Sequence, residues 1–142
     1  MRIRPLLPFA IMAMAIAGCT PTPAERAQMQ QAAATDQADL AAALRGLSPD
    51  KPTQCIGQFP TRQVNAYGPT IVYTISPRLK YVSQTAGGCE GIGQRSRGDI
   101  LVTRTPTGQL CSGDIAQTVD RSSGFFTGSC SFGQFVPYRK AQ

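Results

Sequence analysis

The stretch TIVYTISPRLKYVS, residues 70–83, decides the fold of this chain. Its first part, residues 70–75, is rich in β-branched and aromatic side chains, which favour an extended strand. Ser76-Pro77-Arg78 is typical of a tight turn, and a second run of similar composition follows it at residues 79–83. Two such runs joined by a short turn predict an antiparallel hairpin.

The residues around this hairpin continue the β pattern. Strands and extended pieces are expected at 99–104, 109–111, 115–119, 125–126 and 131–136, with turns at 105–108 and 120–124. Residues 55–64 are expected to hold an irregular first strand and residues 86–93 a loop. Because no stretch after Gly46 has a helical period, the predicted class is all-β. We expect a small antiparallel meander, either a sandwich or a partly open barrel, over residues 53–142.

Aromatic side chains gather near the end of the chain, at Phe125, Phe126, Phe132, Phe135 and Tyr138. We expect them to fill the core of the β domain against Ile71, Tyr73 and Leu101. The alternative is an exposed aromatic patch that binds a ligand.

Four cysteines lie in the β domain, at Cys55, Cys89, Cys111 and Cys130. An even number of cysteines in an exported chain predicts two disulfides, for which three pairings exist. The nested pairing, Cys55–Cys130 with Cys89–Cys111, is the one we expect. The chain has no histidine, so a zinc site would need all four cysteines, and neither a metal nor another cofactor is expected.

The first residues have the layout of a secretory signal. Arg2 and Arg4 precede an apolar run at residues 6–16, which is shorter than the roughly 20 residues that cross a bilayer. Ile16-Ala17-Gly18-Cys19 resembles the bacterial lipobox. This resemblance implies cleavage after Gly18 and acylation of Cys19, so residues 1–18 would be the signal. The alternative is an ordinary secretory signal followed by a chance cysteine.

Residues 19–52 are expected to form a lipidated N-terminus and a helical spacer. Thr22, Pro23 and Glu25 fit the N-cap, N1 and N3 positions of a capping box, and an Ala- and Gln-rich stretch continues to a stop near Gly46. Such a helix would extend for about 34 Å. It would either hold the domain away from the membrane as a spacer, or dock on a partner or self-associate. Thr20, in place of Asp, implies the periplasmic face of the outer membrane in the lipoprotein sorting pattern.

The cysteine spacing and the segments around Cys111 and Cys130, LCSGD and SCSFGQF, resemble a family of short exported proteins of Gram-negative bacteria. The resemblance covers residues 55–138. It implies an exported domain with structural cysteines. The family has no assigned function, so the resemblance implies no catalytic or binding residue.

No motif in the chain identifies a reaction. Without histidine a Ser-His-Asp triad cannot form. Asp114 would need a second carboxylate for acid–base catalysis, so its expected role is to cap a turn. From Cys55 onward there are nine basic and four acidic residues, a net charge of +5. Five of the basic residues are candidates for a face that binds an anionic ligand: Arg78, Lys80, Arg95, Arg97 and Arg104. The alternative is a solvated strand surface.

Three hypotheses for function follow. The first is a non-enzymatic, lipid-anchored envelope protein whose β domain is an interaction or accessory module for another envelope protein. The second is a binding module for an anionic envelope lipid or polysaccharide. The third is an enzyme of unrecognised type. Nucleic acid is not an expected partner, because the chain is predicted to be exported.

Overall fold

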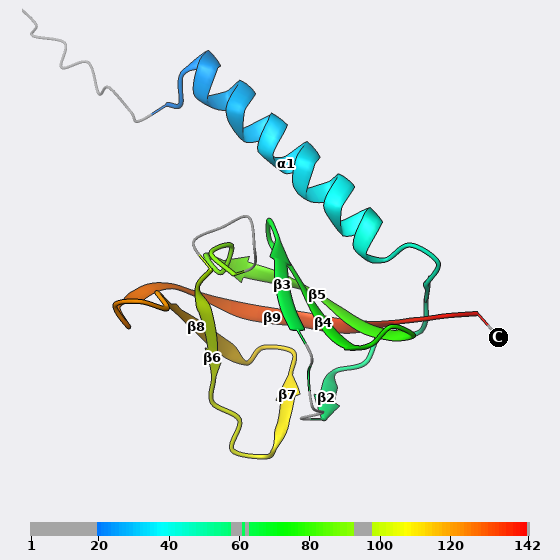
Figure 1. Ribbon diagram of the computed structural model, residues 1–142. Helices are drawn as coiled ribbons and strands as arrows, with labels where there is room; N and C mark the ends of the chain where they lie inside the picture. Colours follow the sequence, from blue (N-terminus) through cyan, green and yellow to red (C-terminus); the bar gives the residue numbers. More distant parts are fainter. Residues whose placement is uncertain (1–19, 58–60, 62, 93–97, 142) are drawn as a thin grey trace, which may run out of the picture.

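The computed structural model describes residues 20–57, 61, 63–92 and 98–141 (Figure 1). Its elements, in chain order, are α1 (Pro23–Ala43), β1 (Ser48–Pro49), β2 (Cys55–Gly57), β3 (Gln63–Tyr67), β4 (Thr70–Ser76), β5 (Leu79–Gly87), β6 (Ile100–Thr103), β7 (Gln109–Cys111), β8 (Ile115–Val119) and β9 (Phe126–Arg139). All strand pairs in both sheets are antiparallel. The predicted all-β class is therefore confirmed.

The main sheet curls into a half-barrel with the strand order β3-β4-β5-β9-β8-β6. The expected hairpin is its β4–β5 pair, in which Val72 lies opposite Val82. Strand β9 comes last in the chain but lies between β5 and β8. Strand β1 pairs with β9 along the same edge as β8. Residues 48 and 49, which were expected to belong to the spacer, therefore join the sheet. Strands β2 and β7 form a separate two-stranded ribbon.

The 14-residue strand β9 replaces the two short extended pieces expected at 125–126 and 131–136. Gly128 and Gly133 interrupt its β-forming residues, and glycine weakens a strand pattern in a sequence. In the structure these glycines allow close contact between backbones. A Cβ atom at Gly133 would lie 2.7 Å from the carbonyl oxygen of Gln84, and one at Gly128 would lie 2.1 Å from that of Gly88.

The core lies between the curled sheet and the β2–β7 ribbon. Phe132 and Phe135 are buried and pack against Tyr73, with ring centroids 6.2 and 6.3 Å from its ring. Ile71 is also buried, as expected, while Leu101 and Tyr138 are partly buried. The prediction for two aromatic residues is wrong, because Phe125 is 76% exposed and Phe126 is 63% exposed. They lie at the β8–β9 turn, beyond the reach of the core.

The two disulfides are Cys55–Cys111 and Cys89–Cys130, so the expected nested pairing is wrong. Strand pairing explains the difference. Cys55 lies directly opposite Cys111 in the β2–β7 ribbon. Gly87 at the end of β5 lies opposite Cys130, which brings Cys89 next to β9. Both contacts join residues more than 40 positions apart in sequence, and local sequence patterns carry no information on such contacts.

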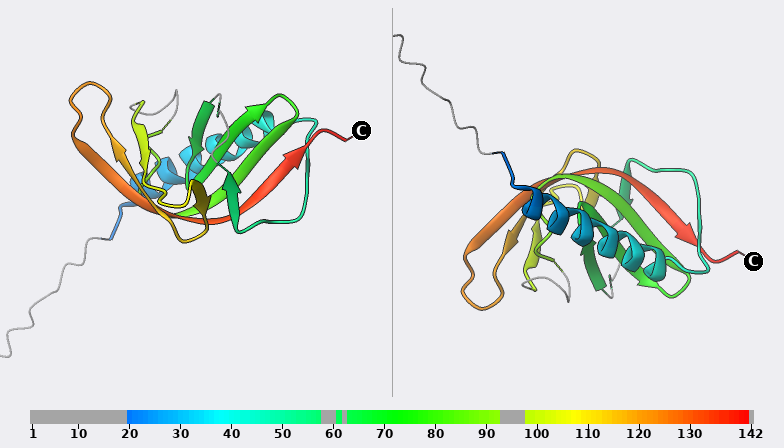
Figure 2. Two further views of the ribbon diagram at one scale, coloured as in Figure 1. Left: turned by 90° about the horizontal axis from the view of Figure 1, so that it is seen from below. Right: turned by 90° about the horizontal axis from the view of Figure 1, so that it is seen from above.

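Helix α1 begins with the predicted capping box. Thr22 Oγ1 accepts a hydrogen bond from the backbone of Glu25, whose carboxylate accepts one from the backbone of Thr22. These bonds lower the pKa of Glu25. No residue of the helix is buried. Its C-terminal half lies along β3 (Figure 2), where Asp36 approaches Gly68.

The disulfide pairing can be tested by mass mapping, because trypsin separates all four cysteines. We expect peptide 46–62 to be linked to 105–121, and peptide 81–95 to 122–139. Removing either disulfide should lower the free energy of unfolding by about 2–5 kcal/mol, measured by denaturant titration of the Cys89→Ala/Cys130→Ala protein. A link between 46–62 and 122–139, or equal stability with and without reductant, would contradict the structure.

Candidate functional site

A pocket opens beside the Cys89–Cys130 disulfide. It has a volume of about 500 Å³, and Glu90 and Asp99 both line it, together with Phe126, hydroxyl groups and glycines. The segment after β5 supplies Glu90, while the residue just before β6 supplies Asp99. The sequence placed Glu90 in the expected loop at 86–93 and Asp99 at the start of the expected strand at 99–104, with nothing to bring them together. The structure brings them to one pocket because the backbone of Gly91 accepts a hydrogen bond from Asp99.

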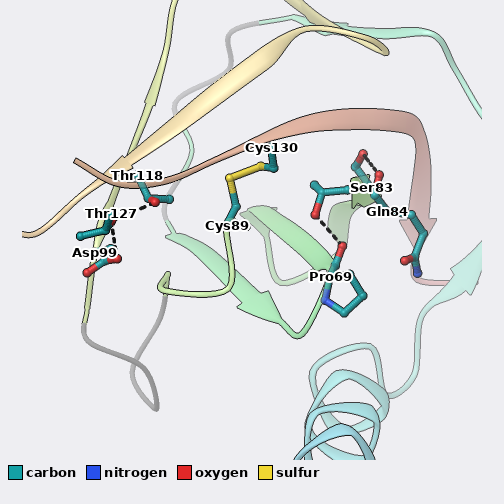
Figure 3. Close-up of a disulfide and its surroundings, with 9 residues drawn as sticks. Pro69, Ser83, Gln84, Cys89, Asp99, Thr118, Thr127 and Cys130 are labelled. Carbon is teal, nitrogen blue, oxygen red and sulfur yellow. Dashed lines mark hydrogen bonds between the residues drawn. A yellow bond between two sulfur atoms is a disulfide. The ribbon is translucent and has the colours of Figure 1, made fainter. Parts of the chain in front are cut away.

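Asp99 is the buried acid of this pocket, with 3% of its surface exposed. Its Oδ2 atom accepts a hydrogen bond of 2.7 Å from Thr127 Oγ1, which lies 3.0 Å from Thr118 Oγ1 (Figure 3). Buried polar groups are stable when they are hydrogen-bonded in this way. The network joins the start of β6 to β8 and β9, so it has a clear structural role.

Glycines bring the backbone segments around this pocket close together. A Cβ atom at Gly91 would lie 2.2 Å from Asp99 Oδ2, and one at Gly87 would lie 2.5 Å from the Ser129 carbonyl oxygen. Close packing therefore explains Gly87 and Gly91 without a phosphate or another ligand.

The other acids of the domain have local partners. Asp114 Oδ2 accepts a 2.7 Å hydrogen bond from the backbone N–H of Cys111, which confirms its expected role in a turn. Asp120 accepts hydrogen bonds from the backbone and hydroxyl groups of Ser122 and Ser123, and these bonds lower its pKa. Among the described residues, no group of three His, Cys, Asp or Glu side chains could hold a metal ion.

The five basic candidates do not form one face in the described structure. Arg78 lies in the β4–β5 turn, and Lys80 Nζ donates a hydrogen bond to the Ala43 carbonyl at the end of α1. Arg104 directly follows Thr103, the last residue of β6, and the register through β8 and β9 places Thr103 level with Gly87. Gly87 and Leu79, which adjoins Arg78 and Lys80, are eight residues apart along β5, a distance of about 26 Å. Arg95 and Arg97 lie outside the described residues.

Arg78 and Lys80 instead join basic residues from both ends of the chain. Leu79 lies opposite Arg139, and the N–H of Lys140 donates to the Arg78 carbonyl at 3.1 Å. Arg45 is exposed two residues beyond the Ala43 carbonyl that Lys80 contacts. We call this group the basic end, which comprises Arg45, Arg78, Lys80, Arg139 and Lys140. Asp50 Oδ2 lies 3.6 Å from Arg139 Nε, in an ion pair at this end.

The expected lipid attachment site, Cys19, and the expected cleavage site after Gly18 lie outside the described residues. The described chain begins at Thr20, next to Cys19. In the described ranges, no helix has both the length and the apolar character that crossing a membrane would require.

No family model, curated protein or solved structure matches this chain. The described residues define its class in structural terms, as a small antiparallel β half-barrel with two disulfides and an N-terminal helix. The resemblances to the lipobox and to a family of exported proteins stay predictions.

The role of Asp99 can be tested through its hydrogen-bond donor. Thr127→Val keeps the shape of the side chain but removes the hydroxyl that donates to Asp99 Oδ2. We expect the free energy of unfolding to fall by about 1–3 kcal/mol, because the buried Asp99 carboxylate loses one hydrogen-bond donor. Thr107→Val, at an exposed turn position, is the control and should change stability little. Equal stability of the two variants would show that the network has no structural role.

Proposed function

We propose that this protein is a lipid-anchored protein of the bacterial cell envelope, whose β domain binds a ligand and catalyses no reaction. The anchor would be Cys19, held on the periplasmic face of the outer membrane. The ligand would be an anionic envelope polymer that contacts the basic end. This proposal combines the predicted lipobox with the charge distribution of the folded domain.

The observation that carries this proposal is the clustering of Arg45, Arg78, Lys80, Arg139 and Lys140 at one end of the sheet. These residues come from three separate parts of the chain, and β9 and α1 bring them together. Basic side chains in such a group attract anions over about a Debye length, roughly 8–10 Å at physiological salt. Arg104 and Arg121 are exposed elsewhere, so the clustering is local.

The position of the basic end favours a polymer over the anchoring membrane as its ligand. Figure 1 shows the C-terminus at one end of the molecule, and the start of α1, next to Cys19, at the other. The 21 residues of α1 span about 31 Å between these ends. A chain held by Cys19 would therefore present its basic end away from its own bilayer. A carboxylate-bearing polysaccharide of the envelope fits that position.

Two features support binding over catalysis. The chain has no histidine, which is the side chain most often used for proton transfer near neutral pH. The acids Asp99, Asp114 and Asp120 are each held in hydrogen bonds that explain their positions in the fold.

The anchor can be tested by the intact mass of the protein extracted from membranes. We expect a chain that begins at Cys19 and carries acyl groups, and that stays in the membrane fraction at high salt. The Cys19→Ala protein should lack this modification. An unmodified chain in the soluble fraction would instead support the ordinary secretory signal.

Binding at the basic end can be tested with isolated cell-wall sacculi as the probe. Arg78→Glu combined with Lys140→Glu should weaken sedimentation with sacculi by about tenfold or more, a change of about 1.4 kcal/mol in binding free energy. Arg104→Glu combined with Arg121→Glu is the matched control, because it changes the net charge equally at exposed positions elsewhere. Equal losses in both variants, or binding unchanged at high salt, would contradict a specific basic site.

A further inference from the structure

Two exposed aromatic residues, Phe125 and Phe126, lie where the β8–β9 turn enters β9, and Phe126 also lines the pocket beside Asp99. Phe125 and Phe126 have 76% and 63% of their surface exposed, more than most other large apolar residues of the described chain. The outer surface beside the hairpin is also apolar, since Ile100, Val102 and Ile115 are exposed on β6 and β8. Exposed apolar patches of this kind mark surfaces that contact another protein or a membrane.

The hairpin tip is an ordered turn. Asp120 N–H donates to the Phe125 carbonyl and Gly124 N–H to the Asp120 carbonyl, both at 2.8 Å. The Asp120 carboxylate also accepts hydrogen bonds from the backbone of Ser122 and Ser123, at 3.0 and 2.8 Å. The two aromatic residues are therefore exposed by a defined backbone, so little ordering is needed before they contact a surface.

The hairpin tip and the start of α1 both lie on the side of the molecule opposite the C-terminus. In Figures 1 and 2 the β8–β9 hairpin and the first turn of α1 are on the left and the C-terminus is on the right, while in Figure 1 the first turn of α1 stands well above the hairpin. Thr20, the first described residue, adjoins Cys19. The basic end lies near the C-terminus, since Arg139 and Lys140 belong to it. The aromatic hairpin and the start of the described chain thus lie on one side of the molecule, and the basic end lies on the other.

We propose that Phe125 and Phe126 insert into the surface of the bilayer that carries the Cys19 anchor. This inference rests on the proposed lipid anchor and adds a second membrane contact to it. Aromatic rings bury well in the boundary between headgroups and acyl chains. Two contacts would fix the orientation of the domain, whereas a single flexible anchor would leave it free to rotate. The basic end would then face away from the membrane.

Fluorescence offers a direct test, because the chain has no tryptophan. The full acylated protein would carry Phe125→Trp or Phe126→Trp and be reconstituted in vesicles of phosphatidylethanolamine and phosphatidylglycerol, with or without brominated acyl chains. We expect a blue shift of the emission and quenching by the brominated lipid. Lys140→Trp, exposed at the basic end, is the matched control and should show neither effect.

The possible outcomes separate this inference from the proposed anchor. An acylated, vesicle-bound protein without quenching at Phe125→Trp or Phe126→Trp would overturn the inference and leave the anchor in place. Quenching without acylation would support the hairpin contact and remove the anchor. Equal quenching at Lys140→Trp would overturn the proposed orientation. A blue shift without quenching, in a protein that sediments as a dimer, would assign the aromatic tip to a second copy and overturn the membrane contact.

Discussion

The fold depends on hydrogen bonding along both edges of strand β9. On one edge β9 pairs with β5 from Cys130 to Arg139. On the other edge it pairs with β8, then with the backbone of Thr53 and Asp50, and finally with β1. An unpaired strand edge leaves backbone donors and acceptors to be satisfied by water or another chain. Because β9 is paired along nearly all its length, it can hold the two halves of the curled sheet together.

Cys130 of β9 contacts strands on both sides and also carries a disulfide. It lies opposite Gly87 on one side and Ala116 on the other, and its sulfur bonds to Cys89. The disulfide holds the segment after β5 against β9. From there the chain continues to Ile92, whose carbonyl accepts from Ala66 of β3 and which bridges to Asp99 before β6. The two edges of the half-barrel are thereby linked at one end.

The sequence predicted the elements that are specified by residues close to one another in the chain. The hairpin of β4 and β5 carries β-branched residues on both sides of a proline turn, and the capping box of α1 lies within four residues. It did not predict the disulfide pairing or the central position of β9, because both depend on contacts between distant strands. Phe125 and Phe126 were assigned to the core by composition alone, although the tight turn after Asp120 places them outside it. Of the basic end, Arg78 and Lys80 were candidates from the sequence, whereas Arg45, Arg139 and Lys140 were not, because long-range contacts bring them there.

The position of α1 changes how far a helical tether can hold the domain from the membrane. A helix that stood free of the domain would hold it about 31 Å from the membrane. Here the C-terminal half of α1 lies along β3, with Asp36 beside Gly68 and the last turn held by Lys80. The second half of the helix therefore follows the domain that it carries, and its first turn lies on the same side of the molecule as the β8–β9 hairpin. A chain anchored just before that turn would keep the domain close to the bilayer. The distance between the basic end and the bilayer would then come from the length of the domain, and not from the helix.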